Sequence, residues 1–259
     1  MIVIPISKLD GLNPLTHAFK DLTFSDLYFS KIRKGTVSDT ASSKVLIVNI
    51  GQKNKTTTRR DISNFIDKVN SSPNYKPKAI GIDVTFKSNS NNSIIDSCLS
   101  KSLSHENVVT ICNLISNEKY GYLVDKNINI FNNNNYGFSN QWLEKNSPFT
   151  ERYFIGNQKI NNKEQIDHIS LSIVKTYDKK LYENFTENND LSIPFLINYR
   201  GNYSKSNNHN INDSLDFSKF KDKVVLVGLF ENDKNGKPVF TEDTHWAPTN
   251  DNYFGRSEK

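Results

Sequence analysis

The sequence predicts an α/β fold, a three-layer sandwich with a mainly parallel central sheet and helices on both faces. Three short apolar runs, each introduced by a lysine, are typical of strands that are buried on both sides. They occupy residues 44–51, 78–86 and 223–228. Segments with helical spacing lie between the apolar runs, and this alternation favours parallel pairing with right-handed crossovers.

The amino-terminal segment is expected to start with a helix. Asn13 and Pro14 supply an N-cap and a first-turn proline for the apolar helical face that follows them up to Leu22. Residues 24–34 fit a helix and a strand equally well.

An amphipathic helix should follow the first strand, residues 45–50. Thr58 has the side chain of an N-cap. The apolar residues recur at i, i+3, i+4 and i+7, which is one face of a helix; they are Ile62, Phe65, Ile66 and Val69. Pro73 and Pro77 end this helix and lead into the second strand, residues 80–86.

Two further helices and three further strands are predicted. The apolar face of the next helix is Ile94, Ile95, Cys98 and Leu99. A strand at residues 108–112 follows, and residues 115–158 show no clear period. The last helix is expected to carry Ile166, Ile169, Ile173, Val174 and Tyr177. Strands at residues 193–199 and 224–228 complete the order.

Composition excludes several classes of function. The 33 basic and 28 acidic residues are interspersed, so the net charge of +5 builds no continuous basic surface and nucleic-acid binding is not expected. No apolar stretch approaches the ~20 residues of a membrane-spanning helix. A phosphate-binding glycine loop, a serine nucleophile elbow and an HExxH metal motif are all missing. We therefore expect no cofactor and no bound metal.

The two cysteines, Cys98 and Cys112, lack the spacing of a metal knuckle or of a redox pair. A helix followed by a strand could bring them together as a disulfide, but two buried free thiols fit the sequence at least as well.

A ligand-binding site is expected beyond the carboxyl ends of the strands, where open α/β sheets bind their ligands. The candidate ligand-binding residues are Asn49, Asp83, Tyr199, Arg200, Asp243 and His245. Each lies at or after the end of a strand of the same predicted sheet or in the loop that follows it. Parallel topology would therefore gather them around one cleft, with Asp83 or Asp243 paired to an arginine.

Two of these residues also have interpretations that involve no ligand. A lone carboxylate in an apolar strand is costly to bury, so Asp83 needs a partner such as Arg200 or Arg152, and a structural ion pair fits as well as a ligand contact. His245 could bind a metal, carry a proton or form a hydrogen bond within its loop, and a packed histidine is the commoner case.

Several short segments match one known family in their order and spacing. They are Val-Leu-Ile-Val-Asn-Ile at 45–50, Gly-Ile-Asp at 81–83, Asn-Val-Val at 107–109, Gly-Phe-Ser-Asn at 137–140, Arg152, Ile-Asn-Tyr-Arg-Gly at 197–201, Val-Val-Leu-Val-Gly at 224–228 and Asp-Thr-His-x-x-Pro-Thr at 243–249. Together they resemble the type-two CHASE domain, the extracytoplasmic sensor module of membrane-bound bacterial adenylate cyclases, histidine kinases and serine/threonine kinases.

This resemblance implies that residues 1–259 form a single sensor domain on the periplasmic side of the bacterial inner membrane, without catalysis of its own. The implied partners are an unidentified small molecule or a periplasmic protein, the cytoplasmic output domain of the parent protein, and the membrane through flanking helices. The apolar fragment at the start and the abrupt end are those expected of a piece of a longer membrane protein.

Two alternatives remain open. One is a metal-assisted hydrolase that uses Asp83, Asp243 and His245 around one ion. The other is a structural protein-interaction domain that binds no small ligand.

Overall fold

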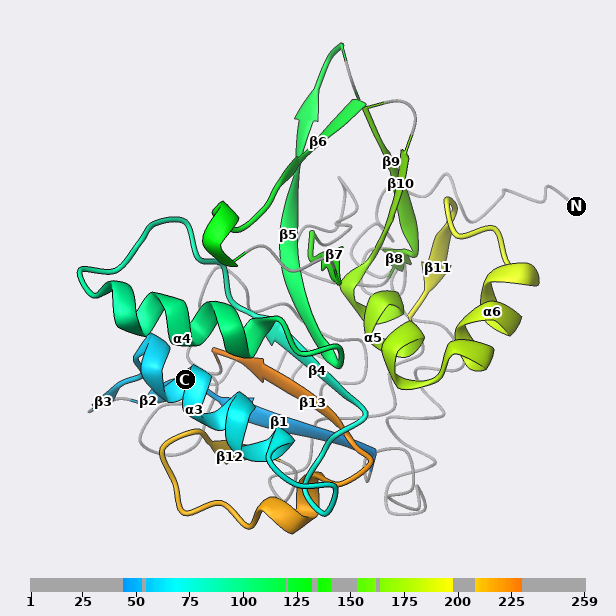
Figure 1. Ribbon diagram of the computed structural model, residues 1–259. Helices are drawn as coiled ribbons and strands as arrows, with labels where there is room; N and C mark the ends of the chain where they lie inside the picture. Colours follow the sequence, from blue (N-terminus) through cyan, green and yellow to red (C-terminus); the bar gives the residue numbers. More distant parts are fainter. Residues whose placement is uncertain are drawn as a thin grey trace, which may run out of the picture.

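The protein is built around a mixed, mostly parallel sheet (Figure 1). The computed structural model describes residues 44–52, 55–119, 121–131, 135–140, 153–161, 164–197 and 208–229. In these residues the sheet has nine strands in the order β10-β9-β6-β5-β4-β13-β1-β12, with β7 paired to β5 as well. Its parallel part contains β1 (Val45–Asn49), β4 (Ala79–Asp83), β5 (Val108–Asn117), β7 (Tyr136–Phe138), β12 (Asn208–Asn210) and β13 (Val224–Gly228). The other strands are β6 (Gly121–Asp125), β9 (Asn157–Ile160) and β10 (Glu164–Asp167).

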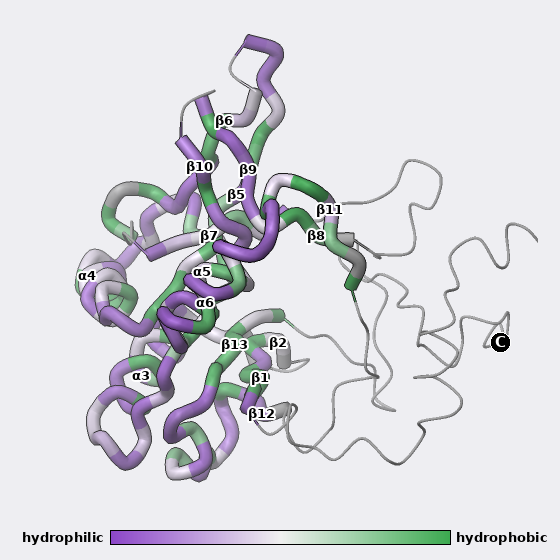
Figure 2. Tube along the Cα trace, turned by 90° about the vertical axis from the view of Figure 1, so that its right-hand side faces the viewer, coloured by the Kyte–Doolittle hydropathy of each residue, from purple (hydrophilic) through white to green (hydrophobic). Residues whose placement is uncertain are grey.

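The parallel centre of the sheet confirms the fold class. Strand β13, the last described strand in the sequence, lies between β1 and β4 and is parallel to both. Val225 stands opposite Leu46 in β1 and Ile80 in β4, and all three are buried. Strand β13 has neighbours on both edges and helices on both faces, so most of it is buried, which accounts for its uninterrupted apolar run (Figure 2).

Helices α3 (Arg59–Asn70) and α4 (Ser93–Leu103) cover one face of this sheet. As predicted, Thr58 caps α3: its side chain accepts a hydrogen bond from the amide of Asp61, and the Asp61 carboxylate accepts one from the amide of Thr58. The predicted apolar face of α3 is buried in the largest core cluster, against side chains of β1, β4 and β13. These helix residues are Ile62, Phe65, Ile66 and Val69.

Helix α5 (Ile169–Tyr177) covers the opposite face, and α6 (Lys179–Glu187) packs beside it. Ile173 of α5 packs with Ala79 and Val109, and Leu226 is packed against the same cluster. Successive side chains of a strand point to opposite faces, so Leu226 faces α5 while Val225 faces α3. Gly81 allows this close approach, because a Cβ there would lie 2.5 Å from the terminal methyl of Ile173. Helices therefore lie on both faces, as the sequence predicted.

The predicted apolar face of α4 is wrong in part. Leu99 is buried, but Ile94 is 70% exposed and Cys98 is exposed as well. Helix α4 is rotated about its axis relative to the predicted orientation because it buries Asp96. The Oδ1 atom of Asp96 lies 2.7 Å from Nη1 of Arg59 at the start of α3. The polar contact between the two helices, and not the apolar spacing alone, decides which side of α4 faces the core.

The orientation of α4 also decides whether Cys98 and Cys112 form a disulfide. Cys98 and Cys112 are both free, with Cys98 exposed on α4 and Cys112 buried in β5. Burial raises the pKa of the Cys112 thiol to about 11.

Two further predicted elements need correction. Ile166 belongs to the edge strand β10, and α5 begins only after His168, whose ring nitrogen Nδ1 accepts a hydrogen bond from the amide of Ser170. The strand predicted at 193–199 is the short β11 (Pro194–Leu196), which pairs with β8 (Tyr153–Ile155) in a separate two-stranded sheet and not in the central one.

The stretch with no clear period is also more regular than the sequence suggests. Strand β5 continues to Asn117 and turns back as β6, and the short helix η5 (Asn129–Phe131) and β7 follow. The remaining short elements are β2 (Gly51–Gln52), β3 (Lys55–Thr56) and η7 (Phe217–Phe220). The helix expected near Pro14 and residues 24–34 lie outside the described residues.

Candidate functional site

The structure brings together two of the predicted site residues at the carboxyl edge of the sheet. Asn49 ends β1 and Asp83 ends β4, and Gly228 of β13 stands opposite both of them. Residues paired in this way point to the same face of a sheet, which here is the α5 face. Asn49 and Asp83 therefore flank a residue without a side chain, at Cα positions about two strand spacings or 10 Å apart.

The other four candidate residues, Tyr199, Arg200, Asp243 and His245, lie outside the described residues, as does Arg152. The expected cluster of Asp83 with an arginine and His245 therefore stays a prediction. The premise that Arg200 follows a strand of the central sheet is wrong in one respect, because β11 pairs only with β8 among the described strands. Asp83 itself is exposed at the end of β4.

Asn49 is held by its own neighbours. Its side chain is 5% exposed. Its oxygen accepts a 2.8 Å hydrogen bond from the amide of Gly51, and its amide nitrogen donates to the Gly51 carbonyl at 2.9 Å and to Oδ1 of Asn210 at 3.4 Å. The amide nitrogen of Asn210 in turn donates to Oδ2 of Asp213 at 2.9 Å. Asn49 thus positions the segment that follows β12 and is too enclosed to present much surface to a ligand.

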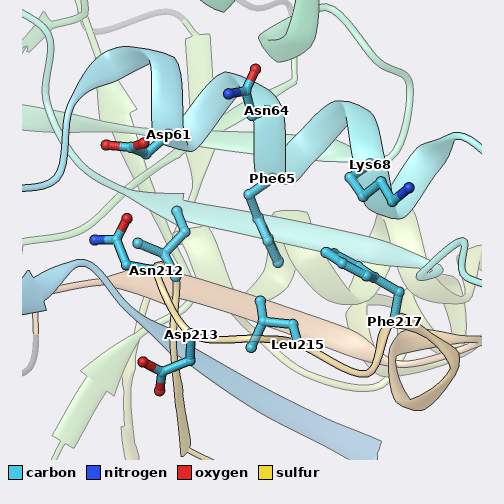
Figure 3. A pocket seen from close by; sticks show the side chains of 9 residues that line it. Asp61, Asn64, Phe65, Lys68, Asn212, Asp213, Leu215 and Phe217 are labelled. Atoms are coloured by element: carbon cyan, nitrogen blue, oxygen red, sulfur yellow. The ribbon is translucent and has the colours of Figure 1, made fainter.

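That segment forms one wall of a cleft that runs from the same edge of the sheet along α3. The cleft has a volume of about 280 Å³ and lies between α3 and the chain that leads from β12 towards β13 (Figure 3). Its lining comprises Asp61, Asn64, Phe65 and Lys68 of α3, and Ile211, Asn212, Asp213, Leu215 and Phe217 of the facing chain. We call residues 211–217 the strap. Phe65 and Ile211 also belong to the main core, so the floor of the cleft is part of the packed interior.

The polar groups of the cleft are fixed by local contacts. Oδ2 of Asp61 accepts 2.8 Å hydrogen bonds from the amide and from the hydroxyl of Thr58. Asn212 donates from its side chain to the hydroxyl of Thr57 at 3.4 Å, which ties the strap to the start of α3. At the other end, Nζ of Lys68 lies 5.9 Å from the centre of the Phe217 ring, within the range of a cation–π contact.

Sequence reasoning missed these lining residues. Asp61 and Lys68 are separated by seven residues, and so lie on one side of α3, but such charges on a helix usually face water. Residues 210–217 are mostly asparagine, aspartate and serine with three scattered apolar residues, which is typical of a surface loop. Their role depends on the position of β12 beside β1, which the order of elements in the sequence does not reveal.

A second cavity lies at the opposite, amino edge of the sheet. It has a volume of about 450 Å³ and lies among Pro73, Lys76, Lys78, Glu106 and Asp222, with three further residues. Lys76 and Glu106 pair across 3.1 Å, so two of its charges already satisfy each other. The cleft between α3 and the strap is the better candidate, because its Asp61 end lies at the strand carboxyl ends, where open α/β sheets bind ligands.

Within the described parts of the chain, no cluster of three or more histidine, cysteine, aspartate or glutamate side chains could hold a metal ion. Asp243 and His245 are not among these residues, so the metal-assisted alternative is untested. The described helices also include none with the length and apolar character needed to cross a bilayer.

Comparison with known proteins points to one family. A search of curated proteins and a search of solved structures each find no match. A family model of the CHASE2 domain, however, matches residues 2–239. This span contains every strand of the central sheet and both walls of the cleft. Because the match extends over most of its length, the chain belongs to the CHASE2 domain family, whose members are extracytoplasmic sensor domains.

Proposed function

We propose that this chain is the sensory domain of a bacterial transmembrane signalling protein and that it binds a small molecule in the cleft between α3 and the strap. The observation that carries the proposal is the cleft itself, which extends along α3 from the carboxyl edge of the sheet in a member of a sensor family. In this proposal the domain faces the periplasm, flanking helices anchor it in the inner membrane, and a cytoplasmic output domain of the parent protein receives the signal.

A sensor works by binding one conformation more tightly than another and needs no chemistry of its own. The strap is suited to this role because it joins β12 to β13, and β13 lies between β1 and β4. A ligand that draws the strap towards α3 would act on both strands. The edge strand β12 has three residues and pairs with β1 alone among the described strands, so it is the easier of the two to displace.

A thermal-shift screen with a matched pair of variants tests the proposal. Leu215→Trp should fill the cleft, and Leu181→Trp places the same side chain on α6, at a leucine that is 52% exposed. A ligand present at 100 times its dissociation constant adds about 2.7 kcal/mol to the stability of the folded state. For a chain of this size the melting temperature should then rise by about 5–10 °C.

We expect such a rise in the wild type and in Leu181→Trp but not in Leu215→Trp. Ligands that stabilise Leu215→Trp as much as the wild type would contradict binding in the cleft. Stoichiometric metal in the purified protein, together with hydrolysis that is lost in His245→Ala, would instead support the metal-assisted hydrolase.

A further inference from the structure

Along α3, the acidic side chain of the cleft lies at one end and the basic side chain at the other. Asp61 lies in the first turn of the helix and Lys68 in the last. Seven residues make almost two turns of an α-helix, so both side chains lie on the same side of it, with about 10 Å of helix between them. In Figure 3 the carboxylate of Asp61 and the ammonium of Lys68 lie towards opposite ends of the cleft.

The strap repeats this order. Asn212 and Asp213 lie near the end marked by Asp61, and Phe217 lies beneath Lys68 (Figure 3). The middle is apolar, with Phe65, which is 4% exposed, pointing from α3 towards Leu215 of the strap. From one end to the other the cleft therefore offers carboxylates and an amide, then an apolar floor, then an ammonium.

We propose that the ligand of this cleft is a short peptide of two or three residues with both termini free. Its ammonium group would lie between Asp61 and Asp213, its carboxylate would meet Lys68, and an apolar side chain would cover Phe65 and Leu215. The inference rests on the proposed function, because it names the ligand class of the same cleft.

The separation of the charges selects this class. An extended chain covers at most about 3.5 Å per residue, so three residues span about 10 Å, which matches the length of α3 between Asp61 and Lys68. In a single amino acid one carbon separates the ammonium from the carboxylate, so the molecule cannot reach both ends. An amine without a carboxylate would form no ion pair with Lys68.

A ligand series tests the two ends separately. We would titrate the full chain by calorimetry with Ala-Leu-Ala, with its N-acetylated form, with its C-terminal amide, and with free leucine. Each blocked terminus removes one charge-assisted hydrogen bond, and we expect each block to weaken binding about tenfold or more. Free leucine should bind more weakly than the tripeptide. Equal affinities of Ala-Leu-Ala and its amide would overturn the proposal.

Variants then assign each terminus to a side chain. Lys68→Gln should bind Ala-Leu-Ala and its amide with equal affinity, whereas the control Lys101→Gln, also a lysine in the last turn of a helix, should keep the preference of the wild type. Asp213→Asn retains a side-chain oxygen that can accept the hydrogen bond from Asn210. Because Asp61 remains, this variant should show a smaller preference for a free ammonium than the wild type. If Lys68→Gln still discriminates between the acid and the amide, the peptide orientation is wrong.

The inference of a peptide ligand and the proposed sensor function can be disproved separately. Suppose that no peptide binds, while another molecule stabilises the wild type and Leu181→Trp but not Leu215→Trp. The peptide inference is then overturned and the proposed function stands. If no molecule distinguishes these variants and no peptide binds, both are overturned.

Discussion

At the scale of single residues, polar side chains in apolar surroundings decide the local structure. Asp96 shows this most clearly. Burial alone would raise the pKa of its carboxyl group, but hydrogen bonds from Arg59 and Ser90 hold the pKa below its ordinary value. Arg59 also lies 5.0 Å from the centre of the Phe131 ring and donates to the carbonyl of Ser88 at 2.6 Å. This contact sets the rotation of α4, and a hydrophobic pattern cannot predict it.

His168 provides a residue-scale prediction about pH. Its ring lies edge-on to Phe138 and Phe154, and burial lowers its pKa to about 4. In the unfolded chain a histidine has a pKa of about 6.5, so between these values the unfolded state binds more protons. The contribution of His168 is complete above pH 6.5 and is lost as the pH falls towards 4.

We therefore expect the free energy of unfolding to fall by about 2 kcal/mol between pH 7 and pH 5 through this residue. Urea denaturation of the wild type and of His168→Asn measures it, since asparagine is also a good N-cap. The difference between the two proteins should shrink as the pH is lowered. A difference that stays constant from pH 7 to pH 5 would show that His168 does not titrate in this way.

At the scale of elements, the sequence predicts the helices and strands whose capping residues and apolar spacing agree with their burial in the fold. The start and buried face of α3 and the strands β1, β4 and β13 could be predicted, because capping and burial both act locally. Helix α6 and the correct start of α5 could not. Ile166 has helical spacing relative to Ile169 and Ile173, but it is buried in an edge strand, where pairing with β9 outweighs the periodicity.

The contact between α5 and the sheet gives an element-scale prediction. Gly81→Ala would place a Cβ 2.5 Å from the terminal methyl of Ile173. Overpacking of this kind costs about 1–3 kcal/mol, and we expect the value to lie in the lower half because a side-chain end can move. Ile173→Val removes that methyl group, so the double variant should recover part of the loss in urea denaturation.

Gly137 provides the matched contrast. A Cβ there would lie 2.6 Å from the Cα of Ile169. The obstacle is backbone, so Gly137→Ala should cost more than Gly81→Ala, and the change Ile173→Val should not relieve it. Equal costs at the two glycines, or no recovery in the Gly81 double variant, would argue against this packing of α5.

At the scale of the whole molecule, the fold was more predictable than the site. Strand and helix alternation indicates a parallel sheet, and the parallel sheet indicates which edge carries ligands. Asn49 and Asp83 were placed at that edge correctly. The cleft was missed because it requires β12 to lie beside β1, with the strap crossing to β13 on the α3 side. Strand order is a property of the assembled sheet, and the short, polar β12 gives no sign of it in the sequence.

Hydrogen–deuterium exchange is the most direct test of a ligand-binding cleft between α3 and the strap. It would be measured on the full chain with and without a molecule that the thermal-shift screen finds to be stabilising. Our account predicts slower exchange in the strap, in α3, and in β12 and β13, with no change in α6. Protection confined to the amino edge, around Lys76 and Glu106, would contradict the account, because binding would then occur at the other cavity.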